Sequence, residues 1–127
     1  MLGRSLLVLA VLLLVFGTVM HGLAIPRAEA AIAGSNLPAF FGGGLKAFWL
    51  NDCADMLILA ALLALFAWRP RTAGRATLFL LALLPAAIGT LLYVFLGAFF
   101  AAPFNLAIAA LVFTAGLVWP KPTEISP

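Results

Sequence analysis

Residues 6–25 read LLVLAVLLLVFGTVMHGLAI, and this stretch decides the fold class. Apart from His21 it contains no ionisable side chain. The hydrocarbon core of a bilayer is about 30 Å thick and a helix rises about 1.5 Å per residue, so about 20 apolar residues cross it. The stretch therefore predicts a transmembrane helix, which Pro26 and Arg27 end.

The composition of the whole chain also indicates a membrane protein. Of its 127 residues, 66% are hydrophobic and 9% are charged, and the mean hydropathy is +1.24. A soluble domain carries about 25% charged residues, so most of this surface must face lipid. The net charge of +3 comes from scattered basic residues that form no stripe, which gives no reason to expect nucleic acid as a partner. A single cysteine, Cys53, excludes a disulfide within the chain.

Three further apolar runs have membrane-spanning length. They cover about residues 45–68, 77–100 and 104–119, with Pro85 inside the second of them and proline or arginine at several of their ends. The chain is therefore predicted to be a single all-α membrane domain, a bundle of four transmembrane helices. Segment 26–44 connects the first two helices. We expect it to form a short interfacial or re-entrant element that Gly42-Gly43-Gly44 breaks.

Basic residues indicate the orientation of this bundle. Five lie at one end of the four spans and two at the other. The five are Arg4, Arg69, Arg71, Arg75 and Lys121, and the two are Arg27 and Lys46. The positive-inside rule then places both termini in the cytoplasm, and we expect a bacterial inner-membrane protein. Trp68 and Trp119 would lie at the cytoplasmic boundary and Trp49 near the outer one.

The N-terminus has one alternative interpretation, a signal peptide with a cleavage site at Ala28-Glu29-Ala30. The apolar run 6–25 is longer than the about 7 to 15 apolar residues of such a peptide. We therefore favour an uncleaved helix.

Polar residues at membrane depth are the most informative, because a charge there costs at least about 2.5 to 3.5 kcal/mol. Asp52 and Asp55 stand three positions apart and so share a face of the predicted helix 45–68. Judged by its position along the sequence, each of the four predicted helices carries a polar side chain in the outer half of the bundle. We predict that they converge on a pocket that opens outward beneath segment 26–44. Its residues are His21, Asn51, Asp52, Asp55, Tyr93 and Asn105.

Two carboxylates and an imidazole can bind a cation or relay protons. A simpler interpretation also stays open, in which Asn51 or Asp52 caps a shorter helix that begins at the membrane surface. The spacing matches no metal motif, and no serine or cysteine stands in the sequence context of a nucleophile. We therefore assign no catalytic residue, no metal ligand and no cofactor, and the sequence favours a protein that is not an enzyme.

Three functions follow as hypotheses. The first is an accessory or assembly subunit of a larger membrane complex. The second is a small transporter or ligand-binding bundle that uses the outward pocket, and the third is a membrane enzyme acting on a lipid or quinone. The expected partners are the lipid bilayer and either other subunits or further copies of the chain. The four-span outline and the short basic loop from Arg69 to Arg75 resemble the DoxX-like group of small bacterial proteins, a likeness that implies no activity.

Overall fold

A computed structural model describes residues 1–120 of the chain, and this part is helical without strands. The helices are α1 (Leu2–Leu23), α2 (Ile25–Ala33), α3 (Ala39–Trp68), α4 (Arg75–Leu96) and α5 (Ala101–Leu117), with a 3-10 turn η1 (Pro70–Thr72) after α3. Three segments of the described part are long and apolar enough to cross a membrane. They are α1 together with α2, then α3, then α4, and α5 is a shorter apolar helix. Lys121, one of the predicted cytoplasmic cations, lies outside the described residues.

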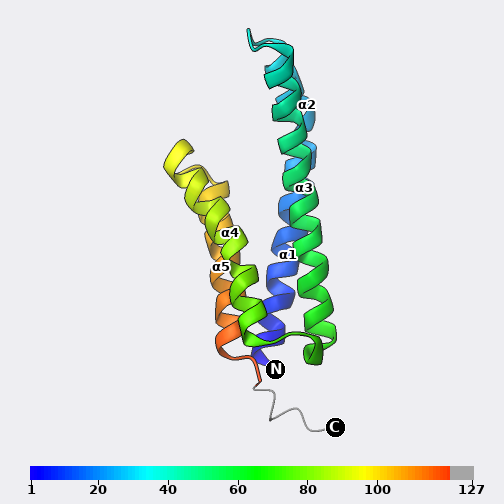
Figure 1. The fold of residues 1–127 in the computed structure, drawn as a ribbon, viewed down its shortest axis with the longest axis vertical. Coiled ribbons are helices and arrows are strands. Elements are labelled where there is room, and N and C mark those ends of the chain that lie inside the picture. Colours follow the sequence, from blue (N-terminus) through cyan, green and yellow to red (C-terminus); the bar gives the residue numbers. More distant parts are fainter. Residues whose placement is uncertain (121–127) are drawn as a thin grey trace.

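Helix α2 continues in the direction of α1. Helices α1, α3, α4 and α5 run alternately up and down and form two hairpins, one of α1 and α3 and one of α4 and α5 (Figure 1). Helix α1 packs against both α3 and α5, so it joins the hairpins. The hairpins meet at the end of the molecule that carries the N-terminus and diverge toward the other end (Figure 1). There α2 and the beginning of α3 extend beyond α4 and α5.

Fully buried side chains on α1 form the centre of the core. Leu7, Ala10 and Leu14 follow each other at helical spacing and are at most 1% exposed. They belong to one apolar cluster with side chains of α3, α4 and α5. Gly17 continues this stripe, and a Cβ atom there would lie 3.0 Å from the Phe104 ring and 3.2 Å from the Met56 sulfur. The glycine therefore lets α3 and α5 approach α1 closely.

Arginines at the end where the hairpins meet bind the carbonyl ends of helices. Arg4 donates through Nε to the Ala67 carbonyl at 2.9 Å and through Nη2 to the Trp68 carbonyl at 3.2 Å. Arg75 Nε donates to the Trp119 carbonyl at 2.8 Å, just after α5. A cation is favourable there because the last carbonyls of a helix lack partners and carry partial negative charge.

Trp119 does not lie on the surface as the aromatic-belt prediction required. Its side chain is 1% exposed, and its indole N–H donates to the Ala73 carbonyl at 3.0 Å. Gly3 of α1 makes room for the ring, because a Cβ at Gly3 would lie 3.1 Å from it. Trp119 is therefore a core residue that ties the end of α5 to the segment before α4.

The predicted break at Gly42-Gly43-Gly44 is wrong, because all three glycines lie inside α3. Gly42 is buried, and a Cβ atom on it would lie 3.0 Å from Cγ2 of Ile32. The missing side chain thus allows α2 to lie against α3. A different glycine does end a helix: Gly97 follows α4 and adopts a φ of 71°, a conformation that stops the helix there.

We predict that Gly89→Ala destabilises the α4–α5 hairpin by about 1–3 kcal/mol, because the added methyl group overpacks the contact. A Cβ atom at Gly89 would lie 2.9 Å from the Ala102 carbonyl oxygen and 2.9 Å from Cγ of Leu106. Gly43→Ala is the matched control, since nothing lies within 4 Å of its Cβ position. It should stabilise the protein by about 0.5–1 kcal/mol. Reversible unfolding by SDS in mixed micelles measures both changes, and equal effects would contradict this packing.

Candidate functional site

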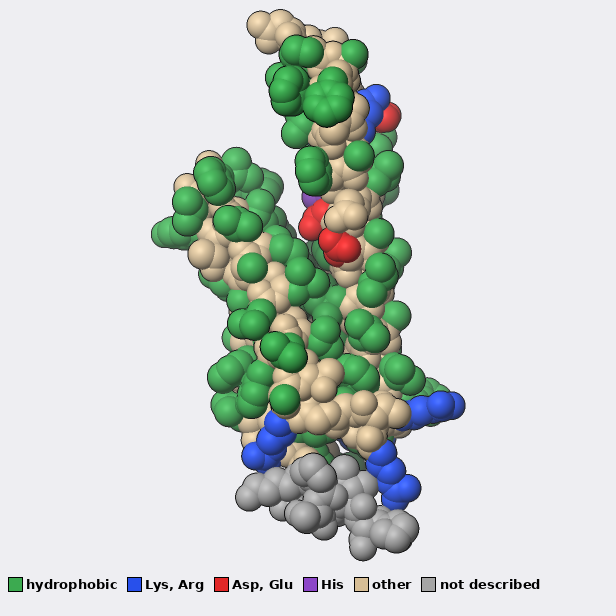
Figure 2. Space-filling view, in the orientation of Figure 1, with side chains coloured by type: hydrophobic (Ala, Val, Ile, Leu, Met, Phe, Trp, Pro, Cys, Tyr) green, Lys and Arg blue, Asp and Glu red, His purple; other side chains and the backbone are tan. Residues whose placement is uncertain are grey.

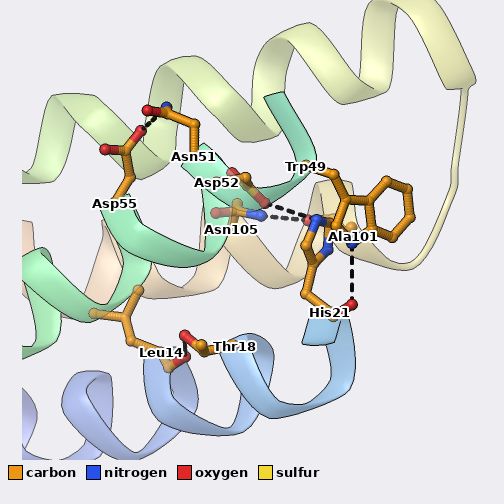
Figure 3. A network of polar contacts seen from close by, with 9 residues as sticks. All are labelled: Leu14, Thr18, His21, Trp49, Asn51, Asp52, Asp55, Ala101 and Asn105. Carbon is orange, nitrogen blue, oxygen red and sulfur yellow. Dashed lines mark hydrogen bonds and ion pairs between the residues drawn. The ribbon is translucent and has the colours of Figure 1, made fainter. Parts of the chain in front are cut away.

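A contact between an imidazole and a carboxylate joins α1 to α3, away from the end where the hairpins meet. His21 Nε2 of α1 lies 3.4 Å from Asp52 Oδ2 of α3, and the two side chains are 28% and 36% exposed. Figure 3 shows both side chains pointing toward one another across the gap between the helices. Two of the six predicted site residues are therefore in contact.

Trp49 completes this contact. Its ring stacks on the His21 imidazole, with centroids 4.2 Å apart and planes 21° apart. Its indole Nε1–H donates to the backbone carbonyl of His21 at 3.1 Å (Figure 3). We call His21, Trp49 and Asp52 the His21 cluster. The imidazole is thus held by a ring, by a carboxylate and through its own backbone.

A second polar pair lies on α3 next to the His21 cluster. The Asn51 amide Nδ2 donates to Asp55 Oδ2 at 2.8 Å, and Asn51 is exposed (Figure 3). The two residues are four positions apart, so they stand on one face of the helix. In the described part of the chain, this amide is the hydrogen-bond partner of Asp55. Asp52 and Asp55 therefore have different partners.

The other two predicted residues take no part in these contacts. The Asn105 amide donates at 2.9 Å to the Ala101 carbonyl of its own helix (Figure 3). Tyr93 on α4 is 58% exposed. The convergence of all six residues on one pocket stays a prediction, whereas the contacts of His21, Asn51, Asp52 and Asp55 are observed.

The capping interpretation of Asn51 and Asp52 is wrong. Helix α3 begins at Ala39 after Pro38, so both residues lie several turns inside it. Their side chains are therefore not bound to free N–H groups of a helix start. The apolar residues around them are consistent with a position partway along a membrane-spanning segment.

Two cavities of the described structure are lined by none of the six predicted site residues. A shallow groove of about 370 Å³ on α4 and α5 is lined by alanine, leucine and phenylalanine side chains, among them Phe79 and Phe113. A crevice of about 30 Å³ lies between α2 and α3 and is lined in part by Trp49 and by the Glu29–Lys46 ion pair. Within residues 1–120 no three His, Cys, Asp or Glu side chains come together in a way that could hold a metal ion.

The sequence interpretation missed the role of Trp49, which it assigned to an aromatic belt. The signal was available, because Trp49 precedes Asp52 by three positions and so shares its helix face. Depth along the predicted helices placed His21 near the level of Asp52, but it did not show that the Trp49 ring would stack on the imidazole.

We predict that Trp49→Phe lowers the free energy of unfolding by about 0.5–1.5 kcal/mol, because the ring is kept but the hydrogen bond to His21 is lost. Trp68→Phe is the control, since the Trp68 side chain is 82% exposed. Unfolding by SDS in mixed micelles gives both values. A loss in the control as large as in Trp49→Phe would show that the bond to His21 contributes nothing.

Comparison with known proteins gives no relative from which a role can be taken. The sequence matches no protein-family model, and no curated protein or solved structure is significantly similar to it. What the chain does must therefore be inferred from its own side chains. The informative ones are the arginines at one end, the His21 cluster, and the Asn51–Asp55 pair.

Proposed function

We propose that the chain is a subunit of a larger membrane complex and that one face of α3 receives a transmembrane helix of another subunit. This face consists of Phe48, Asn51, Asp55, Ile58 and Leu65, which are three, four or seven positions apart. We call it the Asn51–Asp55 face. Four of these residues are exposed, and Asp55 is partly exposed. The observation that carries the proposal is this uncovered stripe with a polar pair in its middle.

The polar pair lies at a level of α3 where covering it with lipid alone would cost free energy. Taking the arginine-rich end as the inner boundary, Asp55 lies about 20 Å along the helix from Trp68. This is well inside a hydrocarbon core of about 30 Å. Lys46 lies about 33 Å from Trp68, at the level of the outer head groups, and is paired with Glu29 at 3.4 Å. A carboxylate at the depth of Asp55 needs a polar or cationic partner, since lipid tails offer none.

Among the described residues Asp55 forms no ion pair, which favours a partner from outside the chain. The arginines Arg4, Arg69, Arg71 and Arg75 lie at the end where the hairpins meet (Figure 2). Lys46 is occupied by Glu29, and Asp52 is paired with His21. Within residues 1–120, the hydrogen-bond partner of Asp55 is the Asn51 amide. A lysine or arginine on a neighbouring transmembrane helix would supply the missing positive charge.

We place this function ahead of a small transporter or ligand-binding bundle. A transporter of this kind requires the predicted polar side chains to share one pocket, and Tyr93 and Asn105 make no hydrogen bond with the carboxylates. The inner-membrane location and the cytoplasmic position of both termini belong to the same proposal. They rest on the cluster of arginines at one end of the molecule.

We predict that Asp55→Asn removes the chain from its complex. Losing one member of a desolvated charge pair costs about 2–5 kcal/mol, so association should weaken at least tenfold. Glu29→Gln is the matched control, because it removes an acid of the same hairpin outside the hydrocarbon level. The measurement is the mass of the tagged protein, by native mass spectrometry, after extraction from its own membranes in a mild detergent.

The outcomes separate the two parts of the proposal. Wild-type chain that is extracted only as a monomer would contradict the function as a subunit. A complex that persists in Asp55→Asn would leave that function standing and overturn the role of the Asn51–Asp55 face. A complex that Glu29→Gln disrupts equally would show that overall charge, and not this face, holds the subunits together.

A further inference from the structure

We propose that the groove between α4 and α5 binds one anionic phospholipid of the leaflet at the arginine-rich end, with the phosphate on Arg75 and one acyl chain in the groove. The groove belongs to the hairpin that does not carry the Asn51–Asp55 face. The proposal therefore does not depend on a contact with another subunit. Two features carry it, the shape of the groove and the charge at one of its ends.

The groove has a floor of small side chains and a rim of large ones. Ala82 and Ala109 line it and are buried, whereas Leu80 and Leu83 line it and are more than half exposed. Every side chain that lines it in the described structure is apolar, and its volume is about 370 Å³. An unfilled space beside these side chains forfeits their dispersion contacts. An acyl chain restores the contacts and leaves no polar group without a partner.

Two aromatic rings line the groove toward the basic end of the hairpin. Phe79 of α4 and Phe113 of α5 have ring centroids 4.9 Å apart. Gly116 lets the Phe79 ring lie against α5, because a Cβ atom on Gly116 would lie 2.7 Å from Cε1 of Phe79. The groove therefore continues over an aromatic surface toward the start of α4.

Arg75 stands at that end of the groove. It comes four positions before Phe79, so both lie on one face of α4, and Ala82 and Ala86 continue this face at spacings of three and four. Arg75 Nε donates to the Trp119 carbonyl, which holds the guanidinium between the ends of the two helices that line the groove. A guanidinium has five N–H groups, so those of Arg75 that this bond does not use can bind phosphate oxygens.

No acid of the described residues forms an ion pair with Arg75. The acidic side chains lie well away from the end where the hairpins meet (Figure 2). A phosphate would supply the missing negative charge. Basic sites between transmembrane helices are known to bind anionic lipid head groups in this way.

Distances along α4 match the dimensions of one leaflet. Measured from Arg75, Phe79 lies about 6 Å and Ala86 about 16 Å along the helix. Half of a 30 Å hydrocarbon core is about 15 Å. With Arg75 at the level of the head groups, the groove thus lies at the level of the acyl chains of the same leaflet. A phospholipid joins an anion and an apolar chain in this order.

Native mass spectrometry of the full chain in detergent tests the charge at Arg75. Titrations with phosphatidylglycerol and with phosphatidylcholine of the same acyl chains give the dissociation constant of the first lipid bound. We expect phosphatidylglycerol to bind more tightly. Arg75→Gln should weaken its binding about fivefold, the contribution of one arginine near a membrane surface, and leave phosphatidylcholine unchanged. Arg69→Gln is the matched control, because it removes the same charge at the end of α3 and should change neither affinity.

A second variant tests the groove without changing charge. Ala110 lines the groove and is exposed, so Ala110→Leu fills the groove and leaves the core intact. Both lipids should then bind more weakly, and Ala87→Leu, at an exposed position of α4 outside the groove, should have no effect.

The outcomes test the two parts of the site separately. Equal affinity of the wild-type chain for both lipids, or a loss in Arg69→Gln as large as in Arg75→Gln, would overturn the phosphate site. Unchanged lipid binding in Ala110→Leu would overturn the groove as the place of the acyl chain.

Discussion

The packing of α1 against both α3 and α5 is the contact on which the rest of the fold depends. Leu7, Ala10 and Leu14 are almost completely buried between these helices. Because the two hairpins are joined chiefly through α1, they can diverge above the core, and the outer part of α3 is left without a neighbour from α4 or α5 (Figure 1). The uncovered Asn51–Asp55 face follows from this arrangement.

Positive and negative side chains lie at different levels along the molecule. Arg4 and Arg75 bind the carbonyl ends of α3 and of the segment after α5, so the cations at that end contribute to stability. The acids of α3 lie far from them. His21 lies against one of these acids, Asp52, and the other, Asp55, is the basis of the proposed contact with a partner helix.

The sequence predicted the helical class, the long apolar helices and the shared face of Asp52 and Asp55, because length, hydropathy and helical spacing determine them. It did not predict that α3 continues through Gly42, since the close approach of Ile32 depends on a contact between helices. The burial of Trp119 was not predicted, for the same reason. Hydropathy gives the depth of a residue but not the neighbour it faces, so the stack of Trp49 on His21 could not be read from it.

The proposed role of the Asn51–Asp55 face depends on Asp55 lying at the level of the hydrocarbon. The most direct test is a nitroxide label on a single cysteine at position 54 or 35 of the Cys53→Ala protein in lipid vesicles, both positions being exposed in the native chain. Collision with oxygen reports hydrocarbon, and collision with a water-soluble nickel chelate reports the aqueous phase. Oxygen should dominate at position 54 and the nickel chelate at position 35. Equal access of the chelate to both positions would contradict the account.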